Sequence, residues 1–245
     1  MTASQDLKDK YSIIISYRNR KEHLQMLLPR LQEVFKDKEY EIIIAEQDDN
    51  DKFQKNSLYN TAVKYSTGNI LVFHDVDYYP SDNVSYYTDK DTPLYPVKQL
   101  IFLNEDSKPK DIDLIPSGYQ NFHNDVGDHS GGVFVLSKEL FYKTNGFNPY
   151  YKGWGKEDDD TRDRLRLLGY TWKRNDEGLF YALHHNDNKP DNNDSDFINN
   201  HILLGNLKSN LHLGCNNVDA DVNEYSGGNN IKWLKINNFK YEDIN

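Results

Sequence analysis

The stretch YKGWGKEDDD, residues 151–160, places a Gly-Trp-Gly unit directly before four consecutive carboxylates. The two glycines free the backbone around Trp154, so this loop could swing an indole over a ligand such as a sugar ring. Residues 157–160 then open a predicted helix, whose dipole and free N–H groups stabilise anions. Because capping needs fewer than four acidic residues, we expect one or two of them to enter a pocket, where a carboxylate can hold and deprotonate a sugar hydroxyl.

Two shorter motifs contain residues that can bind a divalent cation. In HDVD, Asp75 and Asp77 follow an apolar strand and point to the same side, which suits a hard ion such as Mg²⁺ or Mn²⁺. In ALHHND, His184 and His185 end a later strand, and an imidazole beside carboxylate oxygens fits Mn²⁺ better than Mg²⁺. A solvated strand end and a pair of surface histidines are the simpler interpretations, and neither motif alone identifies a metal site.

Apolar periodicity predicts the elements that position these motifs. Short β-branched runs predict strands at 11–17, 40–47 and 69–77, and helical spacing predicts helices at 20–35 and 53–66, the first kinked at Pro29. This alternation predicts right-handed βαβ crossovers and an α/β fold with a mostly parallel central sheet flanked by helices. Ligands of such sheets bind beyond the carboxyl ends of the strands, where all three motifs fall.

The second half is less regular at first. Residues 78–128 read as loops with short strands near 100–103 and 112–115, and order returns with a strand at 133–136. Ser137 is the expected N-cap of a helix that Gly146 ends, and the acidic stretch opens a helix that Gly169 ends. The remaining predictions are strands at 170–174 and 179–185, a polar loop at 186–196, and no clear pattern after residue 213.

Composition excludes several classes of protein. With 37% hydrophobic residues the chain can bury a core, and its net charge of −10 argues against a nucleic-acid partner. The single cysteine, Cys215, excludes an intrachain disulfide, and no run of about eighteen apolar residues predicts a membrane span. We therefore expect a cytoplasmic protein, and the Asn-, Lys-, Ile- and Tyr-rich composition is typical of an AT-rich microbial or viral genome.

Six segments stand in the order and spacing of one enzyme family: IIISYRNRKEHL, FQKNSLYNTA, FHDVDYYP, SGGVFVLSKELFYKTNGF, GWGKEDDD and LHHND. Over roughly residues 13–188 the chain resembles the β-1,4-galactosyltransferases. The resemblance implies a single GT-A (Rossmann-like) domain over 1–245, with a nucleotide-sugar half at about 11–80 and an acceptor and catalytic half at about 129–190. It also implies an inverting, Mn²⁺-dependent transfer of a hexose or N-acetylhexosamine from a UDP-sugar to a hydroxyl of a glycan or glycoprotein acceptor.

The resemblance also implies roles for single residues. Asp158 would be the catalytic base, with Glu157 beside it on the acceptor, and Asp77 and His185 would bind the metal. The implied substrate-binding residues are Arg18, Arg20, Phe53, Lys55, Asp75, His129, Gly132, Trp154 and Asp159. Three positions depart from the family pattern: a metal-ligand Met is Ala182, a Trp is Lys152, and an aromatic residue that influences donor choice is His129. These departures leave the metal preference, the acceptor and the donor sugar open.

Three alternatives remain. A retaining transferase that attaches N-acetylgalactosamine to polypeptides shares the GT-A core and a related Gly-Trp-Gly-acidic segment. A catalytically silent sugar- or nucleotide-binding module is compatible with the departures, although the intact Asp77 and Asp158 argue against it. A metal-dependent phosphohydrolase could use the D-x-D motif, but it has no need of the Gly-Trp-Gly loop.

Overall fold

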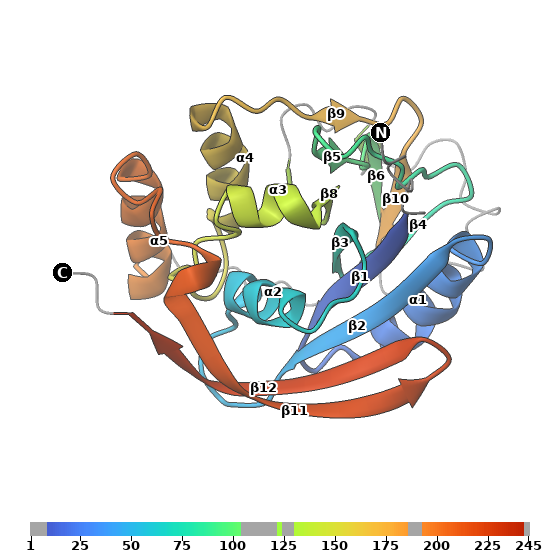
Figure 1. The fold of residues 1–245 in the computed structure, drawn as a ribbon, viewed down its shortest axis with the longest axis horizontal. Coiled ribbons are helices and arrows are strands. Elements are labelled where there is room, and N and C mark those ends of the chain that lie inside the picture. The colour runs from blue at the N-terminus through green and yellow to red at the C-terminus, as the bar shows by residue number, and fades with distance from the viewer. Residues whose placement is uncertain (1–8, 104–121, 124–129, 186–192, 243–245) are drawn as a thin grey trace, which may run out of the picture.

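The computed structural model describes residues 9–103, 122–123, 130–185 and 193–242 of the 245-residue chain. Within these residues an eight-stranded sheet has the order β11-β12-β2-β1-β3-β8-β5-β9, and a four-stranded sheet has the order β4-β10-β6-β7 (Figure 1). The strands are β1 (Lys10–Tyr17), β2 (Glu39–Gln47), β3 (Ile70–Asp75), β4 (Tyr78–Pro80), β5 (Leu94–Tyr95), β6 (Gln99–Phe102), β7 (Phe122–His123), β8 (Val133–Ser137), β9 (Lys173–Arg174), β10 (Leu179–Ala182), β11 (Val218–Gly228) and β12 (Ile231–Tyr241). The helices are α1 (Lys21–Val34), α2 (Lys55–Val63), α3 (Lys138–Lys143), α4 (Glu157–Leu167), α5 (Ser195–Gly205) and a 3₁₀ turn, η2 (Cys215–Asn217).

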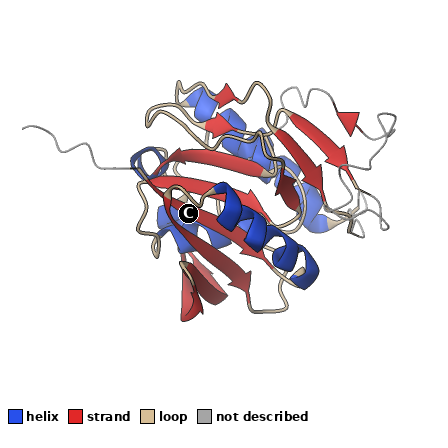
Figure 2. Ribbon diagram, turned by 90° about the vertical axis from the view of Figure 1, so that its right-hand side faces the viewer, coloured by secondary structure: helices blue, strands red, loops and turns tan. Residues whose placement is uncertain are grey.

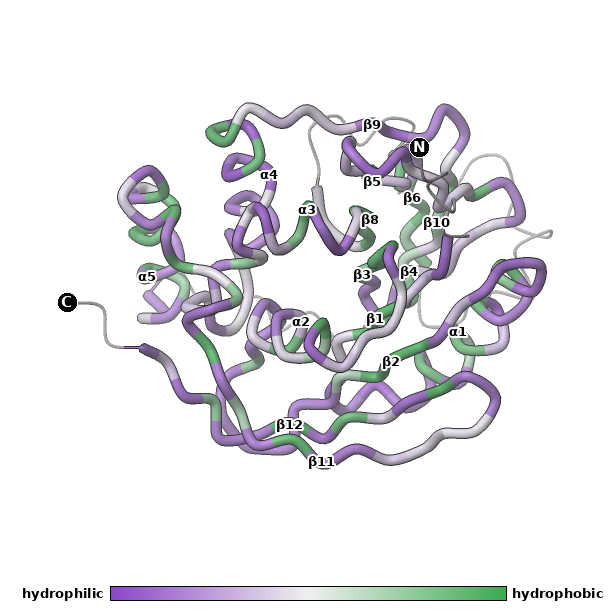
Figure 3. Tube along the Cα trace, viewed as in Figure 1, coloured by the Kyte–Doolittle hydropathy of each residue, from purple (hydrophilic) through white to green (hydrophobic). Residues whose placement is uncertain are grey.

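The centre of the large sheet is the predicted βαβ unit. β1 pairs in parallel with β2 on one side and with β3 on the other, as the sequence predicts. Helices lie on both sides of the twisted strands (Figure 2), and the apolar segments of β1 and β2 are visible in Figure 3. The predicted α/β class with a mostly parallel sheet is therefore confirmed.

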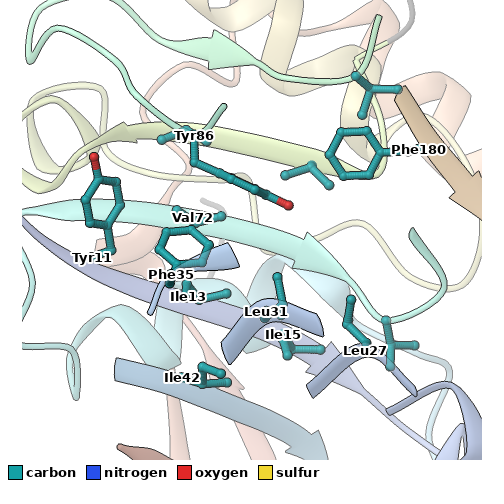
Figure 4. Packing of buried hydrophobic residues seen from close by; sticks show 14 of the residues in the cluster. Tyr11, Ile13, Ile15, Leu27, Leu31, Phe35, Ile42, Val72, Tyr86 and Phe180 are labelled. Carbon is teal, nitrogen blue, oxygen red and sulfur yellow. The ribbon is translucent and has the colours of Figure 1, made fainter. Parts of the chain in front are cut away.

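Three consecutive isoleucines of β1 explain why both faces of the sheet are covered. Ile13 and Ile15 pack on one face against α1, where Leu27 is fully buried (Figure 4). Ile14 points to the opposite face and belongs to the cluster of Leu58 on α2. Successive strand residues alternate between faces, so a strand that is apolar throughout needs a helix on each side.

The order of strands departs from a purely parallel sheet beside β3. β8 pairs with β3 in the antiparallel direction, and β5 pairs with β8, also in the antiparallel direction. β3 also ends at Asp75, and residues 76–77 form a turn into β4. The prediction of one strand over 69–77 is therefore wrong at its end, and Asp77 lies in a turn that leads from one sheet to the other.

The C-terminal part holds two elements that the sequence does not predict. α5 begins at Ser195, inside the stretch predicted as a polar loop, and Asp194 caps it by accepting from the backbone N–H groups of Asp196 and Phe197. β11 and β12 form a long hairpin, and β12 adds in parallel to β2. Most of β11 is exposed and polar, so it lacks the apolar signal of a core strand.

The predicted helix ends are correct at two sites and shifted at a third. The Ser137 hydroxyl accepts from the Leu140 N–H at 3.2 Å and caps α3, and Gly169 follows the last residues of α4 with φ +83°. At the end of α3, Asn145 takes the left-handed position with φ +60°, and Gly146 follows it. The Gly146 N–H then donates to the Phe141 carbonyl at 2.8 Å, which closes the last turn.

The short predicted strands are present but displaced or shortened. The strand predicted near 100–103 is β6, those predicted at 170–174 and 179–185 are the shorter β9 and β10, and the one at 112–115 lies outside the described residues. Pro29 stands inside α1, which runs on past it to Val34. Of the helices in the described ranges, none combines the length and apolarity that a membrane crossing requires.

Candidate active site

The candidate site lies where β3, the start of α2 and the start of α4 meet. Lys55 is the first residue of α2, and its Nζ lies 2.8 Å from Glu157 Oε1, 2.8 Å from Asp158 Oδ1 and 3.7 Å from Asp75 Oδ2. One turn along α2, the Tyr59 hydroxyl donates to Asp75 Oδ1 at 3.0 Å. The structure thus brings together four of the predicted residues, from the carboxyl end of a strand and the N-termini of two helices.

Burial makes this cluster electrostatically unusual. It raises the pKa of Asp158 to about 7 against the opposing charge of Lys55, and the neighbouring Glu157 adds to the rise. Burial likewise raises the pKa of Asp75 to about 6. Burial alone would lower the pKa of Lys55, but the carboxylates around it raise that pKa well above its usual value. The Asp158 side chain keeps 38% of its surface exposed, so this carboxylate is both strongly perturbed and accessible to a ligand.

The four consecutive carboxylates have separate partners. Glu157 and Asp158 face Lys55, whereas Asp159 pairs with Lys156 and Arg162, each at 3.1 Å. Asp160 turns inward, is completely buried, and contacts the Nε of Arg164 at 3.2 Å and the hydroxyl of Tyr151 at 3.1 Å. Two of the four acidic side chains therefore face Lys55, while Asp159, one of the predicted substrate-binding residues, is held by two cations.

The loop before α4 has the left-handed backbone that its glycines allow. Gly153 and Gly155 have φ +67° and +105°, and Lys156 continues with φ +75°. The Gly153 N–H donates to the Phe53 carbonyl at 2.8 Å. Trp154 is 54% exposed and its indole stacks on Phe197 of α5, with ring centroids 6.0 Å apart and planes at 23°. The loop thus presents an exposed aromatic surface close to the acidic turn.

Asp77 and His185 form a second polar pair. Asp77 Oδ2 lies 2.9 Å from His185 Nε2. This contact connects the turn after β3 with the residues that follow β10. Two ligands at about 2.1 Å from one ion, at right angles to each other, lie about 3 Å apart, so this separation fits a shared octahedral cation. Ala182, the last residue of β10, has no side-chain atom that could bind a metal ion. Among the described residues, no three His, Cys, Asp or Glu side chains gather to hold a metal ion by themselves, so the remaining ligands would have to come from substrate or water.

One side chain, Tyr78, lies near both the Asp77–His185 pair and the acidic cluster around Lys55. Tyr78, the first residue of β4, is half-buried, and its loss of solvation together with the charges of Asp77, Asp75 and Asp158 raises its pKa well above the usual value. All three carboxylates therefore lie close enough to act on one phenol. Asp75, predicted near the ribose, faces Lys55 rather than Asp77, because β3 ends between the two aspartates.

The remaining predicted residues have other partners or lie outside the described part of the chain. The Arg18 guanidinium lies 5.3 Å from the centroid of the Phe53 ring and donates to the Asp51 carbonyl, and Arg20 stands at the N-terminus of α1. Gly132 has φ +86°, and a Cβ there would come within 2.0 Å of the Tyr78 ring, so the backbone passes close to that phenol. His129 lies outside the described residues.

Sequence reasoning missed three residues of the site. Tyr59 lies four residues after Lys55 on one helix face, and that spacing could have identified it. Ser130 donates from Oγ to the Asp158 carbonyl at 3.0 Å, and it follows directly the residue considered for donor choice. Phe197 directly follows the predicted polar loop, in a stretch for which the sequence predicts no element, so no sequence signal points to its contact with Trp154.

Two family models match this chain. The N-terminal region of glycosyl transferase group 7 matches residues 4–90, and the N-terminal domain of galactosyltransferase matches residues 118–186. β-1,4-Galactosyltransferase 4 of Cricetulus griseus is 34% identical over 164 residues, which are 64% of this chain and 43% of that protein. β-1,4-Galactosyltransferase 5 of Mus musculus is 30% identical over 223 residues, which are 87% of this chain and 52% of that protein. The chain thus spans about half the length of the curated relatives it matches.

Solved structures share the fold. The catalytic domain of Drosophila β1,4-galactosyltransferase 7 in complex with xylobiose superposes with a TM-score of 0.67 at 22% identity, covering 93% of both chains. A mutant of the Drosophila enzyme in complex with manganese, UDP-Gal and xylobiose gives the same values. GalNAc-T7 with UDP, GalNAc and Mn²⁺ has a TM-score of 0.57 at 12% identity and covers 82% of this chain. The predicted GT-A type of α/β fold is therefore confirmed.

Proposed function

Because the chain belongs to the β-1,4-galactosyltransferase family, we propose that it is a metal-dependent inverting glycosyltransferase. The donor is a UDP-sugar carrying a hexose or N-acetylhexosamine, and the acceptor is a hydroxyl of a glycan or glycoprotein. The observation that carries this proposal is the cluster of Asp158, Glu157, Asp75 and Lys55, in which one accessible carboxylate has a pKa near 7.

The acceptor is activated by Asp158. Its carboxylate takes the proton of the acceptor hydroxyl while that oxygen forms a bond to the anomeric carbon of the donor sugar. The bond between the anomeric carbon and the phosphate oxygen breaks on the opposite face, and UDP leaves with that electron pair. One displacement of this kind inverts the anomeric configuration. Glu157, 2.8 Å from the same lysine, lies beside the base and binds acceptor hydroxyls.

Asp77 and His185 would hold the divalent cation, and their 2.9 Å separation fits one. When bound, Mn²⁺ supplies Lewis-acid stabilisation of the negative charge on the UDP leaving group. The Drosophila complex with manganese and UDP-Gal supports Mn²⁺ as the ion and UDP-galactose as the first donor to try. Because only these two described side chains would bind the cation, its affinity would depend on the nucleotide diphosphate.

The aromatic surface and the arginines bind the two substrates. Trp154, stacked on Phe197, offers an apolar face to an acceptor sugar and excludes water when its loop closes. Arg18, packed on Phe53, is suited to the nucleotide diphosphate, as is Arg20. We assign the nucleotide-sugar half to about residues 11–80 and the acceptor half to about residues 129–190 of one domain, and a cytoplasmic location and a microbial or viral origin stay predictions.

A donor screen tests the proposal. The protein is incubated with Mn²⁺ and each of a set of UDP- and GDP-sugars, and thermal stabilisation and release of the nucleotide are measured with and without acceptor sugars. We expect Mn²⁺-dependent stabilisation by a UDP-sugar and UDP release that rises with acceptor. Binding without UDP release under any condition would instead support the silent binding module. Transfer with retained configuration would support the polypeptide N-acetylgalactosaminyltransferase alternative, whose fold GalNAc-T7 also shares at 12% identity.

A further inference from the structure

Lys55 lies at the junction between the donor side and the acceptor side of the site. Its ammonium contacts Glu157 and Asp158 at 2.8 Å each, both from α4, and Asp75 of β3 at 3.7 Å. The lysine side chain is only 12% exposed. One positive charge is therefore shared by three carboxylates, and it is already committed to the protein before any substrate binds.

The contact uses one specific oxygen of the base. Lys55 Nζ donates to Asp158 Oδ1, and within the described residues no side chain or backbone N–H donates to Asp158 Oδ2. The Ser130 hydroxyl fixes the other side of the residue by donating to the Asp158 carbonyl at 3.0 Å. Oδ2 is thus the oxygen that can receive a proton from an acceptor hydroxyl, and the lysine bond sets its direction.

Other groups around Asp158 oppose its ionisation. Glu157 on the same helix and Asp75 on β3 are negative. Tyr78 on β4 and Tyr95 on β5 also lie near Asp158, but their phenols are neutral and add no charge. Burial favours the neutral acid as well. Lys55 is the cation in contact with Asp158, so it is the group that favours the charged form that a base requires.

We propose that Lys55 is a positioning residue for catalysis: it keeps the Asp158 carboxylate ionised, aims Oδ2 at the acceptor, and couples it to Asp75 on the donor side. This inference rests on the proposed function, because it assumes that Asp158 is the base. It differs from a role in which Lys55 only binds the nucleotide, since such a role would affect donor affinity and leave the base unchanged.

The test compares the pH dependence of kcat in the wild type, Lys55→Met and Lys55→Arg, from about pH 5.5 to about pH 9.5. Removing the lysine charge raises the pKa of Asp158, so the acidic limb of Lys55→Met should move up by about one pH unit or more. Its rate should fall by about tenfold at neutral pH and recover in part at high pH. Lys55→Arg keeps the charge and should keep the limb near its wild-type position. Lys240→Met, which removes a 65% exposed lysine paired with Asp221 at 2.9 Å, is the control for loss of a surface lysine charge and should not move the limb.

Two results would overturn the inference. One is a Lys55→Met profile that falls by the same factor at every pH, and the other is a change confined to KM for the donor. A stability measurement keeps the test independent of turnover: Lys55→Met should lower Tm at high pH, and adding Asp158→Asn should restore part of the loss, because the second change removes a buried charge without a partner. Additive losses in Tm would count against the inference.

The same data separate this inference from the proposed function. Absence of transfer by the wild type with every donor and acceptor, or full transfer by Asp158→Asn, defeats the proposed function itself. An inactive Asp158→Asn together with an unmoved limb in Lys55→Met leaves the proposed function standing and defeats only the role of Lys55.

Discussion

Two charged clusters share the first turn of α4, and they differ in how well their charges balance. In the pocket cluster, Lys55 faces three carboxylates, and Asp158 keeps 38% of its side chain exposed. In the buried cluster, Asp160 and Arg164 are 0% and 2% exposed, pair one to one, and are joined by the Tyr151 hydroxyl. The Arg164 guanidinium also donates to the Leu211 carbonyl at 2.9 Å.

The difference shows how neighbouring residues of one type can serve stability and chemistry separately. The balanced, hydrogen-bonded pair ties α4 to the segment after α5 and to Tyr151, two residues before the Gly-Trp-Gly unit. Burial, together with an excess of carboxylates around one lysine, instead leaves an acid whose pKa lies close to neutrality, which is the property a general base needs. We expect substitutions in the two clusters to have opposite signatures.

The largest effect should come from Asp158→Asn. Removing the general base should lower kcat by about 10³-fold, which lies within the range typical of general-base catalysis. Binding of UDP and Mn²⁺ should stay unchanged, and Tm should stay the same or rise, because an amide relieves the excess negative charge. Steady-state kinetics and isothermal titration with UDP measure the two halves of this prediction. Turnover within tenfold of the wild type would show that another group takes the proton.

Arg164→Met should have the reverse signature. It leaves the buried Asp160 without its cation, so we expect a loss of about 3–5 kcal/mol in the free energy of unfolding. Denaturant unfolding measures this loss. Arg166→Met is a matched control, since that arginine lies one half-turn further along α4, is 47% exposed and pairs with Asp163 at the surface, and it should cost less than about 1 kcal/mol. Equal losses in the two variants would remove the distinction between the buried cluster and the surface.

The pair of Asp77 and His185 should give an effect of intermediate size. Because Asp77 and His185 would be the two protein ligands, His185→Ala should weaken Mn²⁺ binding in the presence of UDP by at least about tenfold. Paramagnetic titration with Mn²⁺ measures this affinity without relying on turnover. His212→Ala, at an exposed histidine on a different segment, serves as the control. Unchanged Mn²⁺ affinity in His185→Ala would place the cation elsewhere.

The aromatic surface should contribute less than the charged groups. Trp154→Ala removes the ring that stacks on Phe197, and we expect KM for the acceptor to rise about three- to tenfold, with more hydrolysis of the donor. Phe197→Ala should have a smaller effect in the same direction, because it supports the indole from behind. Tyr225→Ala, at an exposed tyrosine of β11, controls for loss of surface aromatic area. A rise in donor KM alone would contradict the assignment to the acceptor.

The smallest effect is a dependence of stability on pH. The pKa of Asp158 is raised from 3.8 to about 7 in the folded protein, so between these values the folded state binds more protons than the unfolded state. This residue therefore stabilises the fold progressively as the pH falls from about 7, and the contribution is lost as the pH rises through that range. Tm measured across this range should show a shallower slope in Asp158→Asn than in the wild type, and parallel slopes would contradict the raised pKa.

Sequence reasoning was most successful where local pattern and packing agree. The runs of isoleucine in β1 and β2 can only be buried strands, and the helices between them follow from apolar spacing. The same logic locates Asp75, Asp158 and Lys55, because parallel strands and the following helices bring their ends to one edge of the sheet. The hairpin β11–β12 escaped prediction because its outer strand is mostly exposed, and its position beside β2 depends on pairing across the chain.

The pairing of charges could not be predicted from the sequence. Adjacent carboxylates point in different directions on a helix, but which one meets Lys55 and which meets Arg164 depends on how α4 is rotated against the sheet. The end of β3 was similarly unpredictable: a single residue decides whether Asp77 continues the strand beside Asp75 or turns toward His185. Both features depend on tertiary packing, and most contacts of the site depend on it as well.

The stereochemistry of the product tests the central claim most directly. A UDP-α-sugar that the protein uses is incubated with acceptor and Mn²⁺, and the anomeric configuration of the new linkage is read by proton NMR before any exchange can occur. Direct displacement by a hydroxyl that Asp158 deprotonates predicts a β-linked product, formed by the wild type and nearly absent with Asp158→Asn. An α-linked product would contradict the account, because it requires retention and leaves a single base at Asp158 without a role.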